Sequence, residues 1–451
     1  MAEADRGWGK TLTLAAMSLG FGVVQLDVTI VNTALNSIGG SLGGGVAGLQ
    51  WIVSAYTLAF AALILSAGSL GDRLGAKRVF MAGFALFTAA SLGCALAPGT
   101  PMLIAARAVQ GIGAALLVPN SLALLNHAYP DETGRGRAVG IWAAGASLAL
   151  TAGPLAGGGL IALTGWRSIF FVNIPIGLAG LWLTWRYAAE TKPSRDHALD
   201  LPGQAAAIIA LGCLAAALIE GGVLGWTRPL VLAGLAASVA ASLLFVLQER
   251  RAARPMLPLG LFQNSRFSAA CLVGLLANIA FYGLIFVLSL FFQQVQGRSA
   301  FATGLAFLPM LAIVLPANLA APHLAERFGT AWVIAGGALL AAAGCLGLLG
   351  IGQDTPYPAL CAQLLALGGG LGLLVPPLTS ALLGSVEKAR SGLAAGVLNS
   401  TRQAGSVLGV ALFGSMIGSA GTFLDGAWVA LVVSSVLLGS ASGAILAWGR
   451  K

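Results

Sequence analysis

The chain has 451 residues, of which 58% are hydrophobic and only 9% are charged, and its mean hydropathy is +0.90. Soluble domains usually carry about 25% charged residues, so this composition excludes a soluble fold. The formal net charge of +9 would suggest nucleic-acid binding in a soluble protein, and here its meaning depends on where the charges lie.

Apolar runs recur along the whole length, each long enough to cross about 30 Å of hydrocarbon as a helix. The sequence therefore predicts an all-α membrane protein with fourteen transmembrane helices. In chain order they are residues 11–34, 47–70, 78–97, 101–125, 137–161, 168–188, 201–221, 229–248, 267–292, 302–323, 331–351, 357–383, 392–420 and 427–448.

The basic residues fall mainly on one side of the predicted membrane. With both termini in the cytoplasm, 19 of the 24 Lys and Arg lie in cytoplasmic segments. Arg167, Arg228 and Arg298 lie outside, and Arg107 and Arg402 lie within apolar runs. This is the bias that sets membrane orientation, so we expect cytoplasmic termini and no nucleic-acid partner.

The chain contains an internal repeat. Asp72-Arg73-x-Gly75 lies between two apolar runs, and Glu326-Arg327-x-Gly329 lies between two others 254 residues later. Such a duplication is usual in secondary transporters. We expect two parallel six-helix repeats separated by two inserted helices, with boundaries at residues 11–188, 201–248 and 267–448.

Signals for other chemistry are missing from the sequence. The five cysteines lie in apolar runs without a CxxC pair, the three histidines form no cluster, and no GxxxxGK[ST] phosphate loop occurs. We therefore expect no cofactor, no metal, no direct use of ATP and no enzyme activity. A polytopic membrane enzyme or sensor remains an alternative, which would need an acid or histidine cluster at one interface.

Several segments together resemble one family. They are Gly68-x-Leu-x-Asp72-Arg73-x-Gly75-x-Lys77-Arg78, Leu26-Asp27-x-Thr29-Ile30-Val31-Asn32, Arg107-x-x-Gln110-Gly111-x-Gly113, Gly153-Pro154-x-x-Gly157-Gly158, Trp166-Arg167-x-x-Phe170-x-x-Asn173 and Asn399-x-x-Arg402-Gln403. With these segments the chain resembles, over its full length, the 14-helix drug:proton antiporters of the major facilitator superfamily. The stretch Leu218-Ile-Glu-Gly-x-x-x-Gly-Trp226 and the preference for Arg over Lys resemble antibiotic exporters of the methylenomycin-resistance type.

Two charged residues inside apolar runs are candidates for proton coupling. A carboxylate such as Asp27 costs about 2.5–3.5 kcal/mol at the centre of a membrane helix, and such groups usually have a function. Arg107 cannot lose its proton and acts only by pairing, while its repeat equivalent, Leu364, is apolar. Packing roles for both residues remain the alternative.

The repeated loop and one glycine-proline pair are candidates for conformational gating. The loop residues are Asp72, Arg73, Gly75, Lys77 and Arg78, with Glu326 and Arg327 in the second copy. Gly75 suits a turn with positive φ, and the acidic residues are candidates for a cytoplasmic latch. Gly153 and Pro154 would kink their helix and seal a leak path. A static turn and generic helix packing are the alternatives.

The sequence thus predicts a proton-driven exporter of small amphipathic drugs or antibiotics in the bacterial inner membrane, working as a monomer by alternating access. Its partners would be the substrate, protons and the lipid bilayer. Substrate contacts are expected from Asp27, Asn32, Gln110, Asn399 and Gln403. A metabolite transporter of the same fold, with other direction or coupling, is the second alternative. Arg402 is expected to snorkel toward the cytoplasmic surface.

Overall fold

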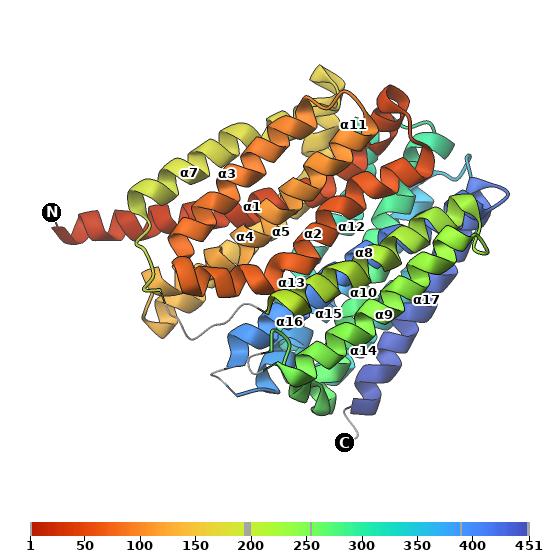
Figure 1. The fold of residues 1–451 in the computed structure, drawn as a ribbon. Coiled ribbons are helices and arrows are strands. Elements are labelled where there is room, and N and C mark those ends of the chain that lie inside the picture. Colours follow the sequence, from red (N-terminus) through yellow and green to blue (C-terminus); the bar gives the residue numbers. More distant parts are fainter. Residues whose placement is uncertain (1, 194–199, 253–254, 388–389, 449–451) are drawn as a thin grey trace.

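The computed structural model describes residues 2–193, 200–252, 255–387 and 390–448, and within these ranges it consists of helices without strands. Figure 1 shows α1–α5 and α7 running together in one group, with α8 and α9 drawn over a second group that includes α10 and α14–α17. The helices are α1 (Ala2–Leu42), α2 (Gly45–Leu74), α3 (Ala76–Ala95), α4 (Thr100–Ala128), α5 (Glu132–Thr164), α6 (Ser168–Phe171), α7 (Asn173–Tyr187), α8 (Leu201–Leu224), α9 (Pro229–Arg251), α10 (Ser265–Leu290), α11 (Ala300–Ala306), α12 (Leu308–Ala312), α13 (Val314–Phe328), α14 (Thr330–Gly347), α15 (Tyr357–Gly384), α16 (Ser391–Ser419) and α17 (Phe423–Trp448). A short 3-10 helix (Leu259–Gln263) precedes α10, and a π-helical turn (Phe291–Val295) follows it.

The predicted fold class is confirmed. Thirteen helical segments of the described residues are long and apolar enough to cross a membrane. Helix α16 is not among them, but it has 29 residues and is enclosed by α2, α8, α10 and α17. Its lower hydropathy reflects polar residues that face protein instead of lipid. Each of the fourteen predicted runs therefore corresponds to a helix or to consecutive helices.

One predicted span is interrupted. The run at 302–323 consists of α11, α12 and α13, with breaks at Phe307 and Ile313. Pro309 and Pro316 follow these breaks by two and three residues. Proline lacks the N–H that would bond the carbonyl four residues earlier, and its ring crowds that carbonyl. The breaks therefore follow from the sequence, although the hydropathy pattern did not indicate them.

The internal repeat is visible in the backbone. Gly75 has φ 96° and ψ 128°, and its repeat equivalent Gly329 has φ 89° and ψ 141°. The expected positive φ at Gly75 is confirmed. A Cβ on Gly83 of α3 would lie 3.1 Å from the carbonyl oxygen of Gly113 in α4. A Cβ on Gly337 of α14 would lie 2.6 Å from that of Gly370 in α15. The pair α3 and α4 in the first repeat and the equivalent pair α14 and α15 in the second thus both cross at glycines.

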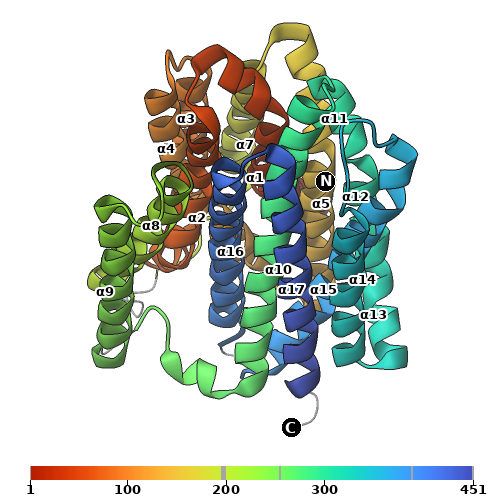
Figure 2. The same ribbon diagram turned by 90° about the vertical axis from the view of Figure 1, so that its right-hand side faces the viewer.

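Helices α8 and α9 are attached to the side of the bundle. Figure 2 shows them at one edge, away from α13 and α14. Helix α8 packs against α2 and α16, and the indole N–H of Trp51 donates to Oε1 of Glu220 at 3.1 Å. Helix α9 packs mainly on α8 and leaves Leu243 and Leu244 exposed. The insert therefore has a lipid-facing surface and adds a wall beside the junction of the two groups.

The two ends of the bundle are distinguished below by the chain termini. Because the chain crosses the bundle an even number of times, α1 begins and α17 ends at the same end, which we call the terminal end. The loops after α2, α4 and α13 also lie there. The opposite end, with the loops after α1 and α3, is called the far end.

Candidate functional site

A buried ion pair joins two of the predicted site residues. Nη1 of Arg107 in α4 donates to Oδ2 of Asp27 in α1. The side chain of Asp27 is fully buried and that of Arg107 is 1% exposed, so neither group keeps contact with solvent. Breaking such a pair by removing one partner leaves an uncompensated charge, which costs about 3–5 kcal/mol.

Neutral polar groups complete the shell around this pair. Gln110 donates from Nε2 to Oδ1 of Asp27 at 2.9 Å and accepts from Arg107 at 2.7 Å. Asn173 at the start of α7 donates to the same Oδ1 at 3.2 Å. Both amides also donate to the hydroxyl of Ser91 in α3, at 2.7 Å and 3.3 Å. The carboxylate is thus held by side chains from α4 and α7, with α3 behind them.

The remaining side of the guanidinium faces α2. Nε of Arg107 donates to the carbonyl oxygen of Ile52 at 3.1 Å, and its Cζ lies 4.2 Å from the ring centroid of Tyr56. Tyr56 is fully buried, and its hydroxyl donates to the carbonyl of Val24 at 3.4 Å. The planar guanidinium of Arg107 therefore makes hydrogen bonds at its edge and stacks on an aromatic ring with its face, which the ammonium group of a lysine could not reproduce.

The structure brings together Asp27 and Arg107, which were predicted for proton coupling, and Gln110, which was predicted for substrate contact. Ser91 and Asn173 join them without having been assigned a role. Asn173 belongs to one of the motifs noted in the sequence. That its amide contacts Asp27 depends on the direction in which the side chain leaves α7, which the sequence does not show. Asp27, Arg107, Gln110, Asn173 and Ser91 thus form one enclosed hydrogen-bonded group.

Two residues beyond Asp27, a threonine connects α1 to α5. Pro154 has no N–H to donate to the carbonyl of Leu150, four residues earlier in α5. The hydroxyl of Thr29 donates to that carbonyl oxygen at 3.0 Å. Close packing at Gly153 accompanies the bond, because a Cβ there would lie within hard contact of the Thr29 hydroxyl. The Gly153-Pro154 motif is therefore a docking point for the helix that carries Asp27.

Helix α5 also contacts the second group of helices. A Cβ on Gly158 would lie 2.6 Å from Cα of Phe301 in α11. Gly304 of α11 packs equally closely on the carbonyl of Pro154, and the hydroxyl of Thr151 donates to the carbonyl of Leu311 at 3.3 Å. These contacts hold the two groups together in the far-end half of the bundle.

Two further junctions close the same half. The hydroxyl of Ser289 in α10 donates to the carbonyl of Asn32 in α1 at 2.5 Å. The amide of Gln50 in α2 donates to the carbonyls of Val410 and Ala411 in α16, at 3.1 Å and 2.8 Å. All three junctions lie between residues of the far-end half of their helices.

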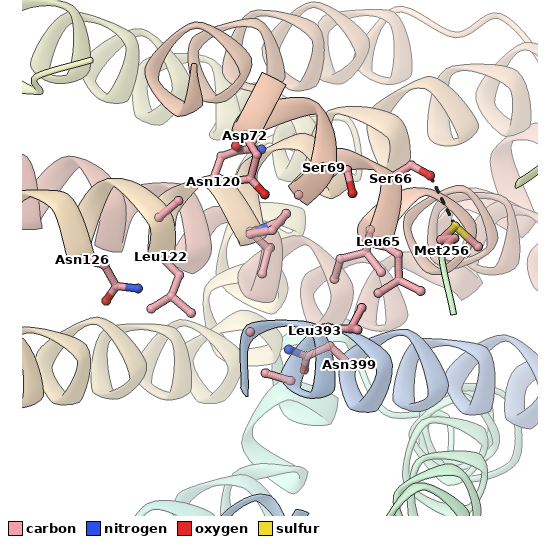
Figure 3. Close-up of a pocket in the computed structure, with 18 of the residues that line it drawn as sticks. Leu65, Ser66, Ser69, Asp72, Asn120, Leu122, Asn126, Met256, Leu393 and Asn399 are labelled. Atoms are coloured by element: carbon pink, nitrogen blue, oxygen red, sulfur yellow. Dashed lines mark hydrogen bonds between the residues drawn. The ribbon is translucent and has the colours of Figure 1, made fainter. Parts of the chain in front are cut away.

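At the terminal end the two groups separate around a cavity of about 740 Å³. Figure 3 shows side chains of α2 and α4 facing those of α16 across it, with Met256 at one edge. Its lining mixes apolar and polar side chains, among them Leu65, Ser66, Ser69, Asp72, Asn120, Leu122, Asn126, Trp142, Met256, Leu393 and Asn399. A cavity of this size suits a drug-sized ligand.

Comparison with known proteins identifies the family. Residues 17–410 match the model of the Major Facilitator Superfamily. The methylenomycin A resistance protein of Streptomyces coelicolor is 39% identical over 435 residues, covering 96% of this chain and 91% of that protein. The multidrug resistance protein Stp of Mycobacterium tuberculosis is 38% identical over 408 residues, covering 90% and 76%. The chain belongs to the major facilitator superfamily.

Solved structures agree with this assignment at the level of the fold. A bacterial homologue of the human lysosomal transporter Spinster, in an inward-facing and unoccupied conformation, superposes with a TM-score of 0.71 at 16% identity, covering 98% of this chain and 97% of that one. A POT family transporter superposes with a TM-score of 0.74 at 15% identity, covering 97% and 96%. Members of the superfamily carry small molecules across membranes, so this chain is a multi-pass membrane transporter and not an enzyme.

In this major facilitator protein, the repeated loop divides into two parts. Lys77 donates from Nζ to the carbonyls of Trp185 and Ala188 at the end of α7, at 3.0 Å and 2.8 Å. Its backbone N–H donates to Oε1 of Glu190 at 2.9 Å, and Arg78 lies 3.7 Å from the same carboxylate. A Cβ on Gly75 would collide with Glu190. This part of the loop is an anchor within one group of helices.

The other predicted gating residues lie apart from that anchor. Asp72 is exposed and lines the cavity, and Arg73 follows it on the surface. Glu326 and Arg327, at the end of α13, are exposed as well.

The predicted substrate residues are not all in one place. Asn399 is exposed in the cavity, and Gln403 follows it one turn further into the bundle. Asp27 and Gln110 are enclosed in the polar shell. Asn32 is 3% exposed and donates to the carbonyl of Val28 within its own helix at 2.8 Å.

The ion pair makes a prediction about stability. Arg107→Met should lower the free energy of unfolding by about 3–5 kcal/mol, because it leaves the buried Asp27 carboxylate without a cation. Adding Asp27→Asn to it should restore much of that loss, since the neutral amide needs no counter-charge. Thermal unfolding of the purified single and double variants measures this coupling. Losses that simply add would show that the two residues act independently.

The bond from Thr29 makes a second prediction. Thr29→Val should lower the free energy of unfolding by about 1–3 kcal/mol, because the partly buried carbonyl of Leu150 is left without a donor. Thr57→Val is the matched control, since the buried hydroxyl of Thr57 bonds only to carbonyls of its own helix, those of Val53 and Ser54. If Thr29→Val and Thr57→Val lose equal thermal stability, the hydrogen bond between α1 and α5 contributes no more than a bond within one helix.

Proposed function

We propose that this transporter is a proton-driven exporter of small amphipathic drugs or antibiotics, working as a monomer by alternating access. The observation that carries the proposal is the buried Asp27, held by an arginine in a chain otherwise poor in membrane charges. The named roles of the relatives in antibiotic and multidrug resistance support the substrate class.

The proposed location is the bacterial inner membrane, with both termini in the cytoplasm. The distribution of Lys and Arg supports this orientation, because 19 of the 24 lie in segments at the terminal end. The cavity then opens to the cytoplasm, where an exporter loads its substrate. Its combination of Leu65, Trp142 and Leu393 with Asn126 and Asn399 suits a molecule that has both apolar and polar parts.

The moving parts of the proposed cycle are the two repeats. Residues 11–188 and 267–448 rock against each other, and residues 201–248 follow as an attached insert. The far-end junctions at Gln50, Ser289 and Gly158 open as the cavity closes. This is the rocking exchange expected of a duplicated transporter.

Asp27 is the proposed proton carrier. It is enclosed in the cytoplasm-open state, so a proton reaches it only after the far-end junctions separate. Protonation removes the charge that holds Arg107, which frees the guanidinium to turn toward α2. A proton motive force of about 150 mV supplies roughly 3.5 kcal/mol per charge. Full inversion of a two-state equilibrium needs about 5.5 kcal/mol, so one proton biases the cycle without driving it alone.

Asp27→Asn should abolish proton-driven export while the protein still reaches the membrane. Cells that express the wild-type chain should accumulate less fluorescent dye, and a protonophore should remove that difference. The variant should lose at least tenfold in drug resistance. Asp425→Asn is the control, since Asp425 is exposed at the far end and bonds Thr422. Retained, protonophore-sensitive export by Asp27→Asn would place the carrier elsewhere.

The acidic residue of the repeated loop is the proposed latch of the outward-facing state. Asp72→Ala should shift the population toward the cytoplasm-open form and lower export, and Glu326→Ala should do so more weakly, because its loop lacks the anchoring Lys77 and Arg78. Labelling of Ala395→Cys in the cavity from the cytoplasmic side measures the shift. Unchanged labelling with normal export would make Asp72 an ordinary turn residue.

A further inference from the structure

Arg402 lies near the middle of α16, eleven residues from the start of the helix at Ser391, which is about 16 Å along its axis. The snorkelling expected from the sequence stays a prediction, and the surroundings of the side chain support a different role. The side chain is partly buried, and its Cγ lies 3.4 Å from the position that a Cβ on Gly274 in α10 would take.

The guanidinium of Arg402 has no counter-charge. Within the described part of the chain, no side chain or carbonyl accepts a hydrogen bond from it and no carboxylate forms an ion pair with it. The titratable group that faces it is the phenol of Tyr282. Arg107, by contrast, has a carboxylate, an amide and a carbonyl as acceptors.

The acids on the described helices around Arg402 lie toward helix ends. Asp72 is in the last turn of α2, Glu220 is near the end of α8 and accepts from Trp51, and Asp425 is in the first turn of α17. The other acids in the described residues from 255 onward, Glu326, Asp354 and Glu387, are also at helix ends or in loops. Asp27 of the other repeat is already enclosed by its own partners. An arginine at this depth is costly and calls for an anion. The missing charge must therefore come from outside the protein.

The position of Arg402 points to the cavity as the source. Gly396 and Asn399 of α16 line it, and Arg402 continues the same helical face one turn deeper. Tyr282, beside Arg402, packs against the apolar clusters of both groups of helices, so this region is the junction between the repeats. Substrates of repeat-built transporters bind at that junction.

We propose that Arg402 binds the carboxylate of an amphipathic organic acid, whose apolar part occupies the cavity beside Leu65 and Leu393. This assignment rests on the proposed export function and names the substrate class for the same cavity. Arginine suits it because the planar guanidinium pairs with a carboxylate through two parallel hydrogen bonds.

Binding of a matched pair of probes to the purified full chain tests the proposal. Titration of 1-naphthylacetate and of its neutral analogue 1-naphthylacetamide, followed by tryptophan fluorescence, should show at least tenfold tighter binding of the acid to the wild type. Arg402→Gln should reduce this preference to about one without weakening the amide. Arg228→Gln, which removes an exposed far-end charge, should keep the preference.

Three results would overturn the proposal. The wild type could bind the acid and the amide equally well, or Arg402→Gln could keep the preference for the acid. Chloride could also raise the thermal stability of the wild type but not of Arg402→Gln, with no effect of naphthylacetate, which would make this an inorganic-anion site. Arg402→Lys, which keeps the charge, should retain part of the preference and serves if the glutamine variant unfolds. The two proposals fail separately: protonophore-sensitive dye export by a wild type without acid preference would overturn only this assignment, and acid preference without such export would overturn only the export function.

Discussion

The pairing of Asp27 with Arg107 constrains the whole first repeat. Two opposite charges without solvent in a membrane protein are tolerated only with close pairing and with every remaining lone pair and proton satisfied. Here the partners come from α1, α3, α4 and α7, and the guanidinium also reaches the backbone of α2. Five of the seven helices from α1 to α7 are thereby fixed relative to one carboxylate. A change in the charge of the Asp27 carboxylate would therefore alter contacts that involve all five helices.

The bond from Thr29 to α5 extends this constraint to the junction between the repeats. Asp27 and Thr29 are two residues apart on α1, and Thr29 supplies the hydrogen bond that Pro154 removes from α5. The next turn of α5 packs through Gly158 on α11 of the other repeat. Two steps of direct contact therefore join the proposed proton site to a surface that must separate in the cycle. This gives the Gly153-Pro154 motif a physical role beyond close helix packing.

The sequence was sufficient for those features that depend on order along the chain. Hydropathy placed the spans, and the 254-residue offset predicted that Gly75 and Gly329 form equivalent turns. Sequence analysis was not sufficient for contacts that depend on the rotation of a helix about its axis. Asn173 was visible in a motif, but nothing in the sequence placed its amide on Asp27. The gating role of Lys77 and Arg78 stays a prediction, but the sequence did not indicate their contacts with Glu190, which depend on how α7 ends beside α3. The sequence shows that the apolar runs around Arg402 contain few acids, but only the structure shows which side chains lie beside its guanidinium.

Arg107 and Arg402, the two arginines within the predicted apolar runs, differ in their partners, and this difference supports a separate proposed role for each repeat. Arg107 has its acceptors within its own protein, on Asp27, Gln110 and the carbonyl of Ile52, and in the proposed cycle its energy changes when Asp27 gains or loses a proton. Arg402 lacks a protein anion, so its energy changes when an anion enters the cavity. The repeat symmetry does not require either charge, since Leu364 replaces Arg107 in the second copy. In the proposed cycle, the cation of one repeat responds to protons and the cation of the other repeat responds to substrate. If both repeats move together as proposed, each event changes the free energy of the other, which is the reciprocity that coupled transport needs.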